Sequence, residues 1–380
     1  MPVRTFLLTI GILSLTSCNQ LQRSGAKVLP LDPPTLQAYD HPKNVILLIG
    51  DGMGLTQISA GLYSNGNFLN LEAFPVIGLH KAYSSSDLIT DSAAGATAFA
   101  SGIKTYNGAI GVNAKGHAVP TILEEAEAEG LSTGMVTTST IVHATPAAFA
   151  AHRAKRNMFE EIASDLLRTE IDLLIGGGKK YFDQREKDER NLYQELLGKG
   201  YQVSDYFTQD FQDLTYQSDR NLVYFTANED PLPRSAGRDY LVPASKMAPV
   251  FLKGRSKKGF FLMIEGAQID WAGHANNADY LIDEMIEFDE VVGEILAFAR
   301  QDGETLVILT ADHETGGLAI NPGSSMNDLV SAFTTDYHTG SLVPVFAYGP
   351  GSELFAGIYE NTDIYYKMKA ALGLDQKLDQ

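Results

Sequence analysis

The stretch IEGAQIDWAGH, residues 264–274, places two carboxylates and an imidazole directly after an apolar, aromatic segment. Glu265, Asp270 and His274 are side chains of the kind that bind divalent metal ions, because hard oxygen ligands and imidazoles together suit zinc and magnesium. Asp270 and His274 could also be an ordinary i,i+4 pair on a helix. These residues alone leave two interpretations open, an ordinary polar loop or a metal site.

Similar side chains follow other apolar segments of the chain. They are Asp51 after NVILLIG, Asp312 and His313 after TLVILTA, and His143 and Thr145 after the segment near residue 135. Ligands of open α/β sheets bind outside the carboxyl ends of the strands, so these side chains are expected at one edge of a sheet. Each has an ordinary explanation by itself, since a strand-end aspartate such as Asp51 often caps a helix. Their coincidence predicts a site for several metal ions.

A candidate nucleophile lies in LITDSAAGATAFASGIKTYNGAIGV, residues 88–112. Ser92 follows Asp91 at the start of a small-residue, alanine-rich stretch that is typical of a helix N-terminus. The backbone N–H groups and the helix dipole favour an anion there, either a serine alkoxide or a phosphoryl oxygen. Ser92 could equally be a plain N-cap. Arg156 could be a solvated charge or a guanidinium clamp for two phosphoryl oxygens.

The elements that must position these residues alternate along the chain. Short apolar runs predict buried strands at residues 44–49, 132–136, 171–175, 260–264 and 305–309, with 342–347 nearer an edge because of Pro344. Helical patterns occupy residues 121–130, 157–171 and 281–300. The alternation predicts an α/β fold with a doubly wound, mostly parallel sheet and helices on both faces. It forms one domain, residues 44–380, with an irregular insertion at about 177–255.

The composition limits the partners of the chain. It has 380 residues, of which 44% are hydrophobic, and a formal net charge of −18. This charge argues against a nucleic-acid-binding surface and would repel anionic substrates at long range.

The N-terminus has the pattern of an export signal. Arg4 precedes FLLTIGILSL, a run too short to span a membrane but typical of a signal-peptide core. It ends in LTSC at Cys18, the only cysteine, which predicts a lipoprotein signal over residues 1–18 with Cys18 lipidated. Residues 19–43 would be a tether, and the protein would lie in the periplasm or at the cell surface, anchored to a bacterial membrane. A plain secretory signal or a core helix are the alternatives.

Together these segments resemble the alkaline phosphatase family. The resemblance covers roughly residues 44–349 and rests on GDGMG, TDSAAGATAFASGIKTYNGAIGV, HATPAAFAAH, EGAQID followed by GH, TADHETGG and HTGS. It implies hydrolysis of phosphate monoesters through a phosphoserine on Ser92, with Arg156 as the phosphate clamp. It also implies a homodimer.

The resemblance further implies three metal ions, two zinc and one that is usually magnesium. The implied ligands are Asp270, His274 and His338 for the first zinc, Asp51, Asp312 and His313 for the second, and Asp51, Thr145 and Glu265 for the third metal. Zinc would activate the Ser92 hydroxyl without a histidine base and would stabilise the entering and leaving oxygens. Four carboxylates and three divalent ions leave the site formally at about +2, so an acidic protein can hold a locally positive pocket.

Two positions depart from some members of the family. His143 stands where they carry an aspartate, two residues before Thr145, and Trp271 stands where they carry a lysine, directly after Asp270. We expect these changes to alter the third-metal preference, the affinity for product phosphate and the pH optimum. His143 could contact the third metal, and both side chains could contact the substrate.

Other enzymes of the wider superfamily are the main alternative, namely a phosphodiesterase, a sulfatase or a cofactor-independent phosphomutase. The chain has no Cys/Ser-x-Pro-x-Arg sequence of the sulfatase type, and Arg156 suits a dianionic monoester better than a diester. A non-catalytic metal- or phosphate-binding lipoprotein is a second alternative, which Ser92 and the complete ligand set argue against.

Overall fold

The structure is a computed structural model that describes residues 41–374. Its centre is a ten-stranded sheet in the order β14-β2-β13-β8-β1-β7-β3-β4-β6-β5. The strands are β1 (Asn44–Gly50), β2 (Val76–Lys81), β3 (Ser132–Thr140), β4 (Leu173–Gly177), β5 (Gln202–Asp205), β6 (Leu222–Phe225), β7 (Phe260–Gly266), β8 (Thr305–Thr310), β13 (Leu342–Tyr348) and β14 (Gly357–Glu360). Only β13 runs antiparallel to its neighbours, so the predicted mostly parallel sheet is confirmed.

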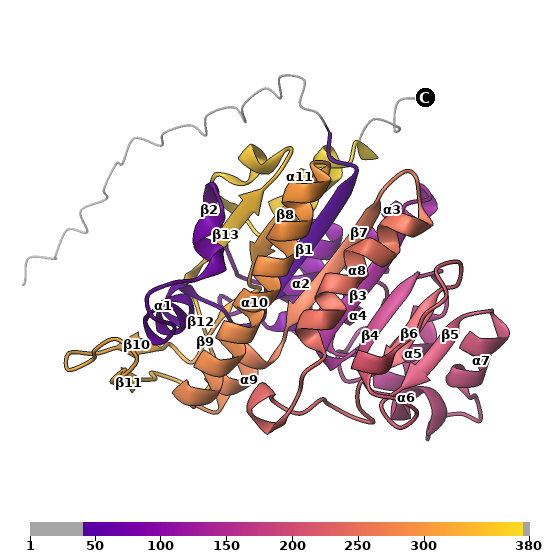
Figure 1. Ribbon diagram of the computed structural model, residues 1–380, viewed down its shortest axis with the longest axis horizontal. Helices are drawn as coiled ribbons and strands as arrows, with labels where there is room; N and C mark the ends of the chain where they lie inside the picture. Colours follow the sequence, from indigo (N-terminus) through magenta and orange to yellow (C-terminus); the bar gives the residue numbers. More distant parts are fainter. Residues whose placement is uncertain (1–40, 375–380) are drawn as a thin grey trace, which may run out of the picture. The chain divides into compact units, whose positions relative to one another are not determined.

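Helices cover both faces of this sheet (Figure 1). One face carries α1 (Leu55–Ser64), α8 (Leu241–Arg255), α9 (Gln268–His274) and α10 (Ala278–Asp302). The other carries α2 (Ser92–Ser101), α3 (Ile122–Ala128), α4 (Ala144–Ala147), α5 (Phe159–Leu166), α6 (Lys180–Asp183), α7 (Leu192–Gly198) and α11 (Asp363–Ala371). Short strands outside the sheet form two pairs, β9 (Glu314–Thr315) with β12 (His338–Thr339) and β10 (Ala319–Ile320) with β11 (Ser331–Ala332).

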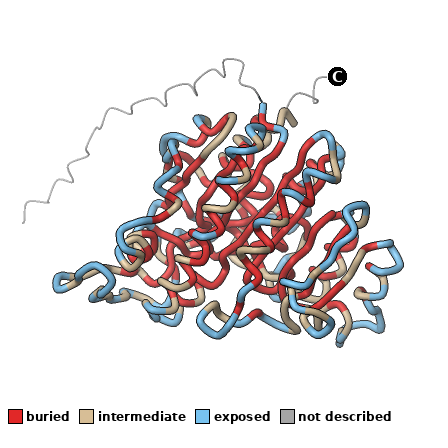
Figure 2. Tube along the Cα trace, viewed as in Figure 1, coloured by how far each residue is buried: buried red, intermediate tan, exposed pale blue. Residues whose placement is uncertain are grey.

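The sheet separates two hydrophobic cores. Successive side chains of a strand point to opposite faces, and in β1 Val45 and Leu47 pack into one core while Ile46 and Leu48 pack into the other. Because both faces are covered, every residue of β1, β3 and β7 is buried. The buried strands run through the centre of Figure 2, with exposed residues in the surrounding loops. Continuous apolar runs therefore predicted these strands well.

The predicted helices at residues 121–130, 157–171 and 281–300 are confirmed as α3, α5 and α10. The predicted edge position of residues 342–347 is wrong, because β13 lies between β2 and β8. The ladder between β13 and β8 begins at Val345, one residue after Pro344, so the proline lies outside that ladder. The segment expected to be an irregular insertion, about 177–255, contributes β5 and β6 to the central sheet and also forms α8.

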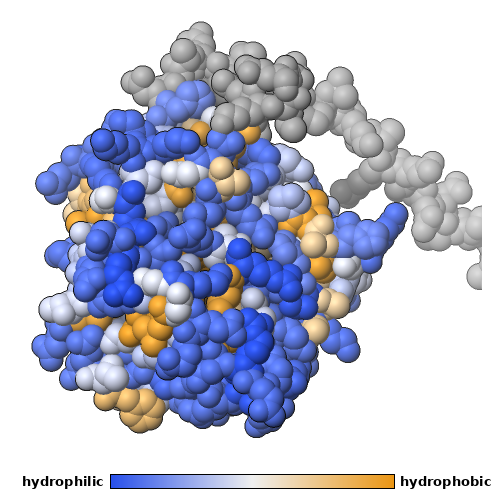
Figure 3. All heavy atoms as spheres, turned by 90° about the vertical axis from the view of Figure 1, so that its right-hand side faces the viewer, coloured by the Kyte–Doolittle hydropathy of each residue, from blue (hydrophilic) through white to orange (hydrophobic). Residues whose placement is uncertain are grey.

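The predictions for the signal peptide, for Cys18 and for most of the tether fall outside the described residues. Within residues 41–374, no helix is both long and apolar enough to cross a membrane. Figure 3 shows one side of the molecule, on which hydrophilic residues predominate and hydrophobic residues form small separate patches.

A buried ion cluster fixes α10 against the loop that precedes α8. Arg238 donates through Nη2 to Glu284 Oε2 at 2.5 Å and also to Glu287, and all three residues are at most 6% exposed. The two glutamates come from one face of α10, the longest helix of the described chain. Removing the guanidinium would leave two carboxylates buried without a countercharge.

We therefore expect Arg238→Met to lower the free energy of unfolding by about 3–5 kcal/mol. Arg234→Met is the matched control, because Arg234 pairs with Glu290 at 2.8 Å near the surface and such pairs contribute about 1 kcal/mol or less. Denaturant unfolding of the metal-loaded protein measures both. Equal losses for the two variants would contradict a special role for the buried cluster.

A candidate metal centre at the carboxyl edge of the sheet

Four of the predicted ligands lie at the carboxyl ends of three adjacent strands. The strands β8, β1 and β7 are neighbours in the sheet, and their carboxyl ends meet at one edge. Asp51 follows β1, Glu265 is the penultimate residue of β7, and Asp312 and His313 follow β8. All four are completely buried, since each is 0% exposed. The parallel register of the strands thus accounts for this gathering of polar groups inside the protein.

Asp270 and His274 lie on a helix, which is one of the two placements that the sequence left open, the other being a loop. The chain turns from β7 into α9, whose i,i+4 spacing brings His274 Nε2 to 3.4 Å from Asp270 Oδ1. His338 arrives on β12, which pairs with β9 directly after His313. Its Nε2 lies 3.6 Å from Asp270 Oδ1 and 3.1 Å from His274 Nε2. The three residues proposed for the first zinc are therefore brought together.

The backbone orients both imidazoles of this cluster. His274 Nδ1 lies 2.6 Å from the carbonyl oxygen of Asp336, and His338 Nδ1 lies 2.7 Å from that of Thr90. A proton on each Nδ1 satisfies these carbonyls, so that each Nε2, once deprotonated, can bind a metal. Metal-binding histidines are commonly held in this way.

A second cluster surrounds His313. Its Nε2 lies 3.5 Å from Asp51 Oδ1 and 3.2 Å from Asp312 Oδ2. Both carboxylate oxygens are buried without a hydrogen-bond partner among residues 41–374, which is a costly arrangement unless a cation lies between them. Asp270 is also within reach of Asp51 and His313, so the two clusters adjoin.

The third predicted ligand set contains only oxygen donors. Thr145 Oγ1 lies 3.4 Å from Asp51 Oδ2, and Glu265 Oε1 is buried with no partner in the described part of the chain. Glu265 Oε2 accepts hydrogen bonds from Thr137 at 2.5 Å and from Ser139 at 3.3 Å. Sequence reasoning missed these two residues. The pairing of β3 with β7 sets Thr137 opposite Glu265, but this register was not evident from the sequence.

The electrostatics of the site favour bound divalent cations. Burial raises the pKa of Glu265 to about 7 and that of Asp312 to about 6, and burial followed by the charge of Asp312 raises the pKa of Asp51. Burial also lowers the pKa of His313 and His338 to about 4, which keeps them in the neutral form that binds metals. The donors present therefore fit zinc and magnesium.

Asp270 differs from the other carboxylates. Burial alone would raise its pKa, but the hydrogen bond with His274 and the charges of the surrounding imidazoles lower it. The same hydrogen bond raises the pKa of His274 to about 9. Thr315 Oγ1 donates to Asp270 Oδ1 at 2.5 Å and lies 3.2 Å from His313 Nδ1, so this hydroxyl links the two clusters. Thr315 was also missed by sequence reasoning.

Ser92 is the first residue of α2 and is not its N-cap. The N-cap is Asp91, whose Oδ1 accepts from the backbone N–H of Ala94 at 3.0 Å. The Ser92 hydroxyl is thus available for other contacts, and its Oγ lies 3.3 Å from His313 Nε2 in a buried position. A Cβ on Gly95 would lie 3.0 Å from Asp312 Cβ, so the absence of a side chain at this position favours the close approach of α2 to the segment after β8.

Arg156 lies beside the same helix. Its Nη1 donates to Asp91 Oδ2 at 3.1 Å, and its Nη2 lies 3.4 Å from His143 Nε2. Its side chain stays 32% exposed, so the guanidinium faces both the site and solvent. The carboxylate of Asp91 thus binds both the N-terminus of α2 and the Arg156 guanidinium, which fixes the guanidinium relative to this helix.

His143 and Trp271, the two residues that differ from the family pattern, contact each other. The rings of His143 and Trp271 meet edge to face, with centroids 6.0 Å apart and planes at 76°. Burial, and then the charge of Arg156, lowers the pKa of His143 to about 3, so this imidazole is neutral. His143 precedes α4 and Trp271 lies on α9, which means that one contact couples the segment of Thr145 to the helix of Asp270.

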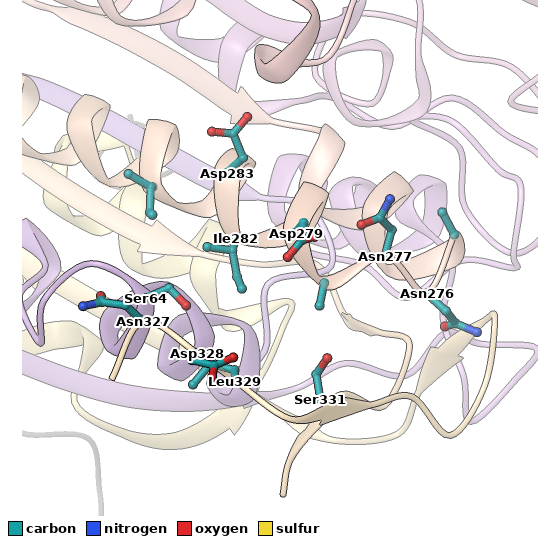
Figure 4. Close-up of a pocket in the computed structure, with 13 residues that line it drawn as sticks. Ser64, Asn276, Asn277, Asp279, Ile282, Asp283, Asn327, Asp328, Leu329 and Ser331 are labelled. Atoms are coloured by element: carbon teal, nitrogen blue, oxygen red, sulfur yellow. The ribbon is translucent and has the colours of Figure 1, made fainter. Parts of the chain in front are cut away.

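A large surface hollow lies elsewhere. It has a volume of about 740 Å³ and is bounded by the start of α10 and the segment before β11, with Asp279, Asp283 and Asp328 among its lining residues (Figure 4). None of the predicted ligands lines it. The chemistry of the donors, and not the size of the cavity, therefore identifies the candidate site.

Comparisons with known proteins agree with this geometry. Residues 42–332 and 325–374 match the family model described as alkaline phosphatase. Alkaline phosphatase 3 of Bacillus subtilis (strain 168) is 33% identical, with 98% of both chains covered. The enzyme of Escherichia coli (strain K12) is 34% identical over 88% of this chain and 87% of that one.

Solved structures of alkaline phosphatases are also similar to this chain. The alkaline phosphatase from the Antarctic bacterium TAB5 is 45% identical, with a TM-score of 0.83 over 88% of this chain and 99% of that one. A mutant of that enzyme, 44% identical over the same shares of the two chains with a TM-score of 0.83, has Mg bound in its M3 site. The resemblance inferred from the sequence motifs is therefore confirmed, and this chain is a phosphatase that belongs to the alkaline phosphatase family.

Proposed function

We propose that this protein hydrolyses phosphate monoesters to an alcohol and inorganic phosphate, through a phosphoserine intermediate on Ser92. One observation carries the proposal. The Ser92 hydroxyl lies buried at the N-terminus of α2, 3.3 Å from His313 Nε2, next to two groups of residues able to hold a metal ion. A serine hydroxyl needs a base or a metal to act as a nucleophile at moderate pH, and this position provides metal-binding groups.

We assign the metals by the chemistry of the donors. Imidazoles with carboxylates suit zinc in two sets, Asp270 with His274 and His338, and Asp51 with Asp312 and His313. The oxygen donors of Asp51, Thr145 and Glu265 suit magnesium. When bound, these ions stabilise the negative charge of the oxygens that enter and leave phosphorus.

The residues of the chain would orient the substrate. The Arg156 guanidinium would bind two phosphoryl oxygens in a bidentate manner, and Asp91 would hold it beside α2. A bond forms between Ser92 Oγ and phosphorus while the bond to the ester oxygen breaks; the serine loses its proton, and the ester oxygen gains one and leaves as the alcohol. Water then forms a bond to phosphorus, the bond between phosphorus and Oγ breaks, and Ser92 regains a proton as inorganic phosphate leaves. Because the transition state of phosphoryl transfer is largely dissociative, positioning and charge stabilisation account for most of the catalysis.

The location and assembly of the protein rest on sequence resemblance. We propose an exported protein, held through Cys18 by a lipid anchor in the periplasm or at the cell surface, that assembles as a homodimer. The substrates are small phosphate monoesters. His143 and Trp271 are proposed to tune the third metal and the binding of phosphate, because His143 contacts both Arg156 and the Trp271 ring on α9.

We expect Ser92→Ala to reduce hydrolysis of a chromogenic phosphate monoester at alkaline pH by at least about a thousand-fold, because the nucleophile is lost. Ser101→Ala is the matched control. Ser101 is also buried on α2, but it lies at the far end of the helix, and this variant should retain activity. Full activity of Ser92→Ala, or turnover that a chelator leaves unchanged, would refute the mechanism. Assays with a diester and a sulfate ester separate the superfamily alternatives, since the monoester should be hydrolysed fastest.

Glu265→Gln should have opposite effects in the metal-free and metal-loaded protein. Burial raises the pKa of Glu265 from 4.5 to about 7, so in the metal-free protein the folded state retains a proton that the unfolded state has lost. Between pH 4.5 and about pH 7 the free energy of unfolding of the metal-free wild type therefore falls as the pH rises. The metal-free variant should gain roughly 1 to 3 kcal/mol relative to wild type over that range.

With zinc and magnesium bound, the same variant should be less stable than wild type, because it has lost a charged ligand. Denaturant unfolding at several pH values, with and without the metals, measures both effects. A constant difference at every pH, unaffected by metal, would refute the role of Glu265 as a metal ligand.

A further inference from the structure

A partly exposed aromatic ring adjoins the ligands proposed for the first zinc. The Tyr337 ring is parallel to the His338 ring within 4°, with centroids 4.5 Å apart, and lies 6.1 Å from the His274 ring. The His338 ring in turn stacks on His313 at 3.5 Å. Exposure rises along this series, from 0% for His313 to 7% for His338 and 47% for Tyr337. The three rings lead from the buried nucleophile to the solvent.

The position of Tyr337 is fixed by its backbone. Its carbonyl oxygen accepts from the N–H of Gly316 at 2.9 Å, and its N–H donates to Thr335 Oγ1 at 3.1 Å. These bonds fix the backbone, and stacking on His338 restrains the ring itself, so less conformational entropy is lost when a second ring stacks on it. An exposed aromatic side chain with this degree of restraint is suited to binding a ligand.

The reaction geometry decides which part of a substrate the ring would meet. In an in-line displacement the entering and leaving oxygens lie on opposite sides of phosphorus. Ser92 Oγ contacts His313, so the leaving oxygen is expected at the neighbouring cluster of His338 and His274. The organic part of the ester would then extend from that cluster towards solvent, past Tyr337.

We propose that Tyr337 is a specificity-determining residue that stacks on the leaving group, and that the site favours aryl phosphates over small alkyl phosphates. This inference rests on the proposed function, because it needs a monoester bound between Ser92 and the cluster of His338. The ring of an aryl phosphate is attached directly to the ester oxygen, which places it within reach of a side chain that stacks on His338.

The test uses competitive inhibitors that share a phosphonate head but differ in the attached group. We expect Tyr337→Leu to raise the inhibition constant of benzylphosphonate, in which a CH2 group takes the place of the ester oxygen, about three- to ten-fold and that of ethylphosphonate less than about two-fold. Tyr337→Phe should behave as wild type, because it keeps the ring. The control is Tyr216→Leu. It removes another exposed tyrosine, which packs on Phe251 ahead of β6, and should change neither constant.

Substrate kinetics provide the second readout. Tyr337→Leu should raise KM for phenyl phosphate and leave KM for ethyl phosphate unchanged, with an unaltered zinc content. Equal losses for both inhibitors, or loss of zinc, would overturn the proposal, since Tyr337 would then act only by supporting His338. A wild-type protein that hydrolyses neither ester and binds neither phosphonate would instead overturn the proposed function. The two failures are therefore distinguishable.

Discussion

The burial of several carboxylates at one point is the constraint on which the rest of this structure depends. Asp51, Asp312 and Glu265 are completely buried and lie close together, and each has an oxygen without a hydrogen-bond partner among the described residues. Such an arrangement is unfavourable in an empty protein and favourable around cations. The large sheet makes it possible, because two covered faces give the strand ends enough rigidity to hold like charges together.

The sequence predicted the centre of the fold and most of the site for the same physical reason. Strands that are buried on both faces have continuous apolar sequences, so the polar residues that directly follow them in the chain could be identified as candidate ligands. The strands β2, β5, β6 and β14 were missed. β5, β6 and β14 have only four residues each, and β2, β5 and β14 are partly exposed. Because of Pro344, residues 342–347 were wrongly predicted to form an edge strand. The proline is tolerated in the internal strand β13 because it lies just before the ladder between β13 and β8 begins.

The supporting hydroxyl groups could not be predicted from the sequence. Thr137, Ser139 and Thr315 contact the candidate ligands only because of strand register and the β9–β12 pair, which a single sequence does not reveal. Threonine and serine near strand ends are common, and nothing in their spacing separates these three from others. Similarly, the contact between His143 and Trp271 joins positions far apart in the chain.

The glycine at position 95 has a consequence for how such an enzyme can change. Because a Cβ there would lie 3.0 Å from Asp312 Cβ, the helix that carries the serine packs very closely against the segment after β8. An added methyl group there would require α2 or Asp312 to shift by a few tenths of an ångström. A larger residue at position 95 would thus change the distance between the serine and Asp312, whereas substitutions on the exposed side of the site would leave that distance unaltered.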